Sequence, residues 1–206
     1  MNDFDLKAKG WDDNPVHMER SVAIAEKILE HLSVIPGMRA MEYGAGTGIL
    51  SFLLKDYFEE IVLLDSSQEM IKVTDDKISA AGAVNLKTRF FDLEKRDLTC
   101  ETFDVIFTQM VLHHIDDVAL ILKRFSALLK NGGILTIADL YTEDGTFHGE
   151  DFKGHKGFDV AQLAQWLTMF GFDEINYQRC YTIKRPDTNS VKEYPVFLLM
   201  GKKRDV

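Results

Sequence analysis

Three glycines at alternate positions form the part of this sequence that is best suited to binding a ligand. Gly44, Gly46 and Gly48 lie in the segment EYGAGTG, residues 42–48. Glycine allows a sharp turn, and because it has no Cβ the backbone can come close to a bound molecule. A helix that begins near Gly48 would direct its free N–H groups at an anionic group. That group is either a pyrophosphate or the carboxylate of a methionine moiety.

The spacing of the glycines argues against a dinucleotide. The dinucleotide fingerprint places glycines at the first, third and sixth positions of the turn. Counted from Gly44, the sixth position is Ile49, and the acidic residue Glu42 stands before the turn. An NAD-dependent oxidoreductase is therefore the less favoured alternative.

Acidic residues follow two further apolar runs. Asp65 comes directly after residues 61–64, and Asp92 comes directly after residues 86–91. In an open α/β sheet, ligands bind at the carboxyl ends of the strands, where an acidic side chain can accept both ribose hydroxyls. These positions predict a ligand that carries a ribose.

The elements that must position these residues alternate along the chain, which predicts a parallel sheet covered by helices. A capping box from Ser66 to Glu69 indicates the start of one helix. The last two β-type runs have no helix between them, so we expect them to pair antiparallel. Strands are expected at residues 39–43, 61–64, 86–91, 103–108, 134–140, 174–183 and 194–201, and helices at 49–58, 66–82, 118–129 and 159–170.

Residues 1–37 are expected to form a helical cap. Asn14 is a good N-cap with Pro15 at the first helical position, and Pro36-Gly37 closes the helix. No internal repeat or linker interrupts the sequence, so residues 1–206 are interpreted as a single domain.

The order of these motifs resembles that of the class I S-adenosylmethionine-dependent methyltransferases, in their small-molecule branch. The resemblance covers residues 38–140 and implies a Rossmann-like, mostly parallel seven-stranded sheet with a C-terminal antiparallel strand and helices on both faces. The segments that carry it are the glycine turn at 42–48, Asp65, FDL at 91–93, FDVIF at 103–107, QMVLHH at 109–114 and LLKNGGIL at 128–135.

The resemblance implies that S-adenosyl-L-methionine is the cofactor and that a small molecule accepts its methyl group. It places the carboxylate of Asp92 beside the adenine amino group. Trp11 either closes over the cofactor or packs the cap onto the sheet. The cofactor-binding residues implied in this way are Trp11, Glu42, Gly44, Ala45, Gly46, Gly48, Asp65, Ser66, Met70, Asp92, Leu93, Gln109 and Met110.

Methyl transfer from a sulfonium is an in-line displacement by a lone pair of the acceptor, so the protein mainly holds the two partners in line. A base is needed only if the acceptor must first lose a proton. The candidate catalytic residues are His114, Asp139, Tyr141, His148 and His155. A positioning role for His114 and ordinary packing for Tyr141 are the alternatives.

The segment 141–157 is expected to be an irregular loop. It is either a lid over the acceptor, with glycine hinges at positions 145, 149, 154 and 157, or a mobile surface loop. A metal site from His148, Glu150, Asp151 and His155 is a further alternative. Because their spacing matches no metal signature, we predict no metal ligands.

Composition limits the partners. The net charge of −9 disfavours binding to a phosphate backbone, and no segment is long and apolar enough to cross a bilayer. Residues 108–111 lack the proline-rich tetrapeptide of amino-methylating DNA enzymes. A small-molecule acceptor is therefore predicted, with a protein acceptor as the alternative, and the oligomeric state is left open.

Two isolated cysteines, Cys100 and Cys180, and a polar amino terminus predict a cytoplasmic protein without a secretory signal. A protein that binds S-adenosylmethionine without catalysis, as a sensor or a partner subunit, is the main functional alternative, since the motifs concern binding rather than turnover.

Overall fold

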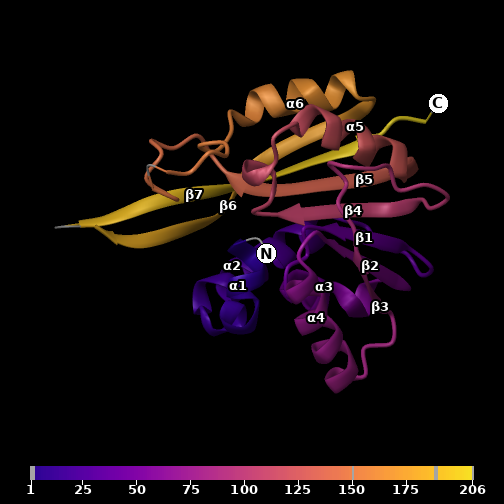
Figure 1. Cartoon of the computed structure of the whole chain (residues 1–206). Helices are drawn as coiled ribbons and strands as arrows, with labels where there is room; N and C mark the ends of the chain where they lie inside the picture. Colours follow the sequence, from indigo (N-terminus) through magenta and orange to yellow (C-terminus); the bar gives the residue numbers. More distant parts are fainter. Residues whose placement is uncertain (1–2, 150, 188–189, 206) are drawn as a thin grey trace.

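One sheet of seven strands organises the computed structural model, which describes residues 3–149, 151–187 and 190–205. The strands lie in the order β3-β2-β1-β4-β5-β7-β6 (Figure 1). They are β1 (Arg39–Tyr43), β2 (Glu60–Asp65), β3 (Leu86–Phe90), β4 (Phe103–Gln109), β5 (Leu129–Leu140), β6 (Phe172–Asp187) and β7 (Ser190–Lys203). The helices are α1 (Asp3–Lys7), α2 (Pro15–His31), α3 (Ile49–Leu54), α4 (Gln68–Ala81), α5 (Val118–Leu128) and α6 (Val160–Met169), with short 3₁₀ helices η1 (Ala8–Asp13), η2 (Lys55–Tyr57) and η3 (Leu112–His114).

The first five strands of the chain are parallel to one another, while β7 runs antiparallel to both β5 and β6. The chain order reverses between β1 and β4, so the carboxyl ends of these two strands lie beside a topological switch point. The expected Rossmann-like sheet with one antiparallel strand is confirmed.

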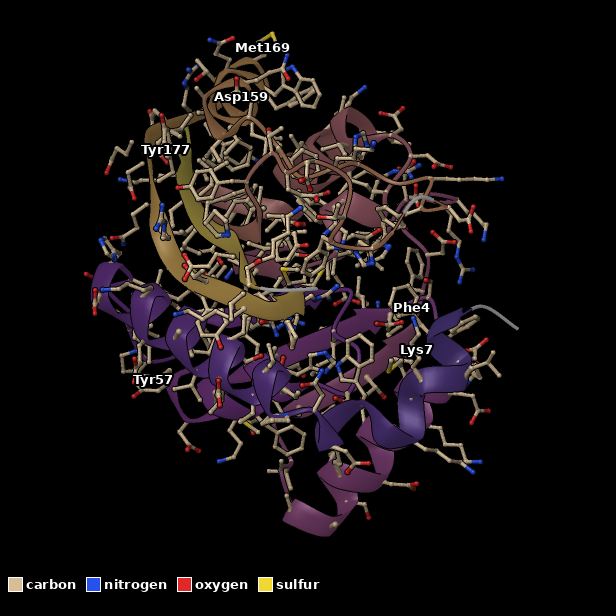
Figure 2. All side chains as sticks on the ribbon, turned by 90° about the vertical axis from the view of Figure 1, so that its left-hand side faces the viewer. Phe4, Lys7, Tyr57, Asp159, Met169 and Tyr177 are labelled. Atoms are coloured by element: carbon tan, nitrogen blue, oxygen red, sulfur yellow. The ribbon has the colours of Figure 1, made fainter. Side chains whose placement is uncertain are left out.

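Helices cover both faces of the sheet, and each face has its own hydrophobic core. One core joins Met41 and Ile106 of the sheet to Phe125 of α5 and Leu167 of α6. The other joins the sheet to α2 and α3, with Ile24 and Leu50 fully buried. In Figure 2, Asp159 and Met169 mark α6 on one side of the molecule, and Phe4 and Lys7 mark α1 on the other.

Two helix boundaries differ from the sequence expectation. Asn14 caps α2 as expected by accepting the Val16 N–H at 3.1 Å, but the helix ends at His31, well before Pro36-Gly37. The cap of α4 is Ser67, whose Oγ accepts the Met70 N–H at 3.2 Å, and not Ser66. Ser67 is the better-placed cap because Asp65 accepts its N–H and holds it before the first turn.

The hairpin of β6 and β7 is longer than the expected strands at 174–183 and 194–201. It extends beyond the edge of the parallel strands, and β6 packs against α2 (Figure 1). Its outer half buries the Ile183–Tyr194 pair, but most of the other paired residues there are exposed, so the sequence shows no sustained apolar pattern. The strand expected at 134–140 likewise begins earlier, at Leu129.

Within the described residues, no helix combines the length and apolar character that are needed to span a membrane.

Candidate functional site

A large cavity lies at the carboxyl ends of the parallel strands, with a volume of about 1220 Å³. Its walls come from the cap, the glycine turn, the end of β2, the segment after β4 and the loop at 141–157. Phe4 and Lys7 of α1, labelled in Figure 2, form part of one wall. The structure brings these predicted site residues to the cavity: Trp11, Gly44, Ala45, Gly46, Asp65, Ser66, Met70, Gln109, Met110, His114 and His148.

The glycine turn is held in a backbone conformation that favours glycine. Gly44, Gly46 and Gly48 have φ values of 67°, 55° and 76°. A Cβ on Gly44 would overlap the side chain of Val111, so Gly44 lets the segment after β4 pack against the turn. A Cβ on Gly46 would instead point between Trp11 and Met70, at 3.9 and 4.0 Å from their nearest atoms. The turn thus keeps one side of the cavity open.

Glu42 lies beneath the turn and is fully buried. Its Oε2 accepts the backbone N–H and the hydroxyl of Ser51 in α3, at 3.1 and 2.5 Å. Among the described residues, Oε1 has no hydrogen-bond partner. Burial raises the pKa of this carboxyl to about 8. The start of α3 was expected to meet an anionic group of the ligand; in the structure, Glu42 accepts one N–H of its first turn, that of Ser51.

Asp65 is fixed at the end of β2 by backbone donors. Its Oδ2 accepts the Gly46 N–H and its Oδ1 accepts the Ser67 N–H, each at 2.7 Å. Burial raises the pKa of Asp65, although these two hydrogen bonds oppose the shift. A carboxylate can accept about four hydrogen bonds, so each oxygen retains capacity for a ligand hydroxyl.

The structure does not bring Asp92 and Leu93 to the cavity. Asp92 pairs with Lys95 at 2.7 Å and accepts the Glu94 N–H, while Leu93 is fully buried in the core. Glu94 lines the cavity in their place. Gly48 also stays outside the lining because it packs against Leu63.

Arg20 is a wall residue that sequence reasoning missed. It is almost fully buried in α2, and among the described side chains its Nε has no hydrogen-bond partner. Burial lowers the pKa of its guanidinium to about 10. Its position in the sequence could have identified it, because Arg20 shares the buried face of α2 with Ile24 and Ile28. A charged residue at a core position of an amphipathic helix requires a partner.

Arg185 of β6 is a second missed cation in the cavity wall. Its guanidinium stacks on the Phe147 ring at 3.9 Å and donates to the Phe147 carbonyl oxygen. The outer half of the β6–β7 hairpin brings this side chain to the cavity, and that part of the hairpin was not predicted.

His113 is the third missed residue, and it pairs with the predicted Asp139. His113 Nδ1 lies 2.6 Å from Asp139 Oδ1, and both side chains are buried. His114 and His148 lie beside His113, with ring centroids 4.2 and 5.0 Å from its ring. Burial is the main reason that the pKa of His114 falls to about 3 and that of His148 to about 4.

Tyr141 and His155 are not part of the cavity wall. The Tyr141 ring packs edge-on against Phe197 at 5.4 Å between centroids, on the face covered by α5 and α6. The His155 ring lies 3.0 Å from the Ile115 carbonyl oxygen and next to Phe158. Asp139 is also outside the lining, and it contacts the lining residue His113.

The loop at 141–157 closes one side of the cavity through Phe147, His148, Asp151 and Phe152. A Cβ on Gly154 or on Gly157 would overlap a backbone oxygen, so both glycines allow close packing. Of the four residues considered for a metal, Glu150 lies outside the described residues.

The sheet order, the glycine turn at its switch point and Asp65 at the end of β2 together define the class I S-adenosylmethionine-dependent methyltransferases, whose cofactor is S-adenosyl-L-methionine. A family model described as a methyltransferase domain matches residues 35–185. The chain therefore belongs to the methyltransferase domain family.

Individual relatives agree with this assignment. The chain is 32% identical over 120 residues to an uncharacterized methyltransferase of Schizosaccharomyces pombe, covering 55% of this chain and 42% of the relative. It is 28% identical over 158 residues to phosphoethanolamine N-methyltransferase 3 of Arabidopsis thaliana, covering 73% of this chain and 32% of the relative. The chain thus spans less than half the length of either curated relative.

The fold is also similar to a solved structure of phosphoethanolamine N-methyltransferase 2 of Haemonchus contortus, in complex with phosphomonomethylethanolamine and S-adenosylhomocysteine. The TM-score is 0.74 at 15% identity, with 100% of this chain and 61% of that chain covered. At this identity the likeness concerns the fold alone.

Proposed function

We propose that this chain transfers the methyl group of S-adenosylmethionine to a small-molecule acceptor by in-line displacement. The observation that carries the proposal is the cavity of about 1220 Å³ that begins at the glycine turn and continues to the histidines. Pockets for one small ligand typically measure roughly 300–1,000 Å³. This cavity has room for a cofactor and an acceptor side by side.

The cofactor occupies the half of the cavity next to the glycine turn. Asp65 accepts the ribose hydroxyls, since backbone N–H groups already fix its carboxylate at the end of β2. Gly44, Ala45 and Gly46 provide a surface without side-chain obstruction for the methionine moiety. The remaining walls of this half come from Trp11, Ser66, Met70, Gln109 and Met110.

Arg20 binds the carboxylate of the methionine moiety. Glu42 already accepts an N–H of the first turn of α3, and Gly48 at the start of this helix does not line the cavity, so the carboxylate needs another positive partner. Arg20 lines the cavity, and its Nε has no hydrogen-bond partner among the described residues. An unsatisfied donor on a buried guanidinium is costly, and a ligand carboxylate can remove that cost through charge-assisted hydrogen bonds.

The acceptor occupies the other half, between the histidines and the loop at 141–157. The names of two relatives support a small acceptor: phosphoethanolamine N-methyltransferase 3 and a ubiquinone biosynthesis O-methyltransferase, the latter 30% identical over 152 residues. The net charge of −9 supports the same choice, because it disfavours a nucleic acid. Phe147 and Phe152 give this half an apolar wall, as most small-molecule sites have.

His114 and His148 are the predicted catalytic candidates that face the acceptor, while Asp139 acts through His113 as a positioning residue. We further propose one domain with a cap at 1–37 and a lid at 141–157. A cytoplasmic location is supported by Cys100 and Cys180, which are both free thiols.

Calorimetry with S-adenosylmethionine and S-adenosylhomocysteine, followed by a metabolite screen for release of S-adenosylhomocysteine, tests the proposal. We expect micromolar binding of both ligands and turnover with at least one small molecule. Binding of NAD without binding of either ligand would refute the proposed cofactor. Binding without turnover on any metabolite, or turnover only on a protein, would refute the proposed acceptor class and favour a sensor or a protein methyltransferase.

A further inference from the structure

Three histidines converge at the acceptor half of the cavity. His113 and His114 come from the short helix η3 after β4, and His148 comes from the loop at 141–157. One ring nitrogen from each can be chosen so that all three atoms lie within 4.8 Å of one another. All three residues line the cavity, so a bound ligand can reach them.

Asp139 fixes the orientation of the first imidazole. A carboxylate only accepts hydrogen bonds, so the 2.6 Å contact places the proton of His113 on Nδ1. Nε2 is then the atom with a free lone pair. Asp139 is itself held by the backbone N–H groups of Leu140 and His113, at 2.7 and 3.3 Å. A carboxylate that accepts from the far nitrogen of a ligating imidazole is the usual outer partner of a metal-bound histidine.

The other two imidazoles are oriented by aromatic rings rather than by hydrogen bonds. His148 stacks on Phe152 at 4.1 Å, and His114 meets Phe4 and Phe152 edge-on at 5.1 and 5.2 Å between centroids. Within the described part of the chain, the ring nitrogens of His114 and His148 have no hydrogen-bond partner. His148 is exposed and His114 is half-buried, so these nitrogens are accessible to a ligand in the cavity.

We propose that His113 Nε2, His114 and His148 bind one divalent transition-metal ion of the Zn²⁺ type, with an open position toward the acceptor. Imidazole suits Zn²⁺ and its neighbours, and catalytic zinc sites typically use three protein ligands and keep a fourth position free. Nitrogens bound to one zinc ion stand roughly 3.4 Å apart, given Zn–N bonds of about 2.0–2.1 Å. The histidines must therefore draw together on binding, and His148 can move because it lies exposed in a loop.

The metal ion also limits which acceptor can react. This part of the inference rests on the proposed function, methyl transfer to a small molecule. A hydroxyl of the acceptor occupies the open position, where the metal lowers its pKa and its proton leaves to water. The resulting oxygen lone pair attacks the methyl carbon. The carbon–oxygen bond forms as the carbon–sulfur bond breaks, and the bonding pair stays on sulfur to give the neutral thioether. The acceptor is thus a molecule with a metal-binding hydroxyl, and no side chain is needed as a base.

Calorimetric titration of the full chain with ZnCl₂ and with CoCl₂, after treatment with a chelator, tests the site. We expect one equivalent to bind, with a change in the visible spectrum of Co²⁺ that reports imidazole ligands. His148→Ala and His114→Ala should each weaken binding by tenfold or more. Asp139→Asn should weaken it by about 10–100-fold, as removal of such outer partners usually does.

His31→Ala is the matched control, since this imidazole is exposed at the end of α2. It should bind the metal as the wild type does. Absence of binding to the wild type would overturn the proposal, as would equal affinity of His148→Ala and His31→Ala. The same samples are also titrated with S-adenosylhomocysteine, and a variant that still binds it is folded. Binding of S-adenosylhomocysteine without binding of the metal would overturn the metal site but not the proposed function.

Discussion

His113 Nδ1 lies 2.6 Å from Asp139 Oδ1, and each side chain is only 1% exposed. The pair joins the segment after β4 to the end of β5, two strands that are neighbours in the sheet. A buried carboxylate that accepts from one nitrogen fixes the tautomer and directs the other nitrogen outward. Asp139 thus positions an imidazole at the cavity without lining the cavity itself.

Asp139→Asn should lower turnover by about 10–100-fold while leaving the affinity for S-adenosylhomocysteine within about twofold. The amide can donate to His113 Nδ1 and so favours the other tautomer. The ¹⁵N chemical shifts of the His113 ring report that change directly. Unchanged shifts with equal losses of turnover and cofactor affinity would show that Asp139 only supports packing.

Asp65→Ala should weaken binding of S-adenosylhomocysteine by roughly 10–100-fold, because hydrogen bonds to a charged group contribute about 1.5–3 kcal/mol. Asp92→Ala is the matched control, since its carboxylate pairs with Lys95 and does not line the cavity. Its affinity should stay within about twofold of the wild type. A large loss for Asp92→Ala would mean that the segment after β3 rearranges when the cofactor binds.

The cofactor half of the site could be predicted because its signals are local in the sequence. A glycine turn between a strand and a helix, and an acidic residue at the end of the next strand, depend on the backbone of consecutive residues. The parallel order of the sheet follows from the alternation of elements. Asp65 and Gly46 accordingly lie where the sequence predicts, and their hydrogen bond joins the two motifs.

The part of the cavity next to the histidines could be predicted only in part: His114 and His148 were named from the sequence, but their contacts are made only by the tertiary fold. Asp139 could be placed at a strand end, but its contact with His113 depends on how β4 and β5 align. Arg185 reaches the cavity through the outer hairpin, whose exposed residues lack an apolar pattern. For Tyr141 the sequence left a catalytic role and ordinary packing open, and only the tertiary contact with Phe197 favours packing.

Arg20→Leu should weaken binding of S-adenosylhomocysteine by about 10–100-fold, since it removes a charge-assisted pair with the methionine carboxylate. Methylthioadenosine lacks that carboxylate, so its affinity should not change. Calorimetry with both ligands separates the two effects. Arg185→Leu, at the Phe147 side of the cavity, is the control and should bind S-adenosylhomocysteine normally. Equal losses for both ligands would indicate that Arg20 acts through packing.

Glu42→Gln should change how the stability of the protein depends on pH. Burial raises the pKa of Glu42 to about 8, whereas the unfolded chain keeps the usual value near 4.5. Between these pH values the folded state holds a proton that unfolding releases, so the stability due to Glu42 falls as the pH rises. Glutamine has no such proton. The free energy of unfolding of the variant, relative to that of the wild type, should therefore rise by on the order of 2 kcal/mol from pH 5.5 to pH 8.

Urea unfolding of both proteins at the two pH values measures this difference. Glu30→Gln on the exposed side of α2 is the control and should shift the stability equally at both pH values. If Glu42→Gln also behaved in that way, Glu42 would be ionised in the folded state. Its carboxylate would then need a positive partner in addition to the Ser51 donors that hold it beneath the glycine turn.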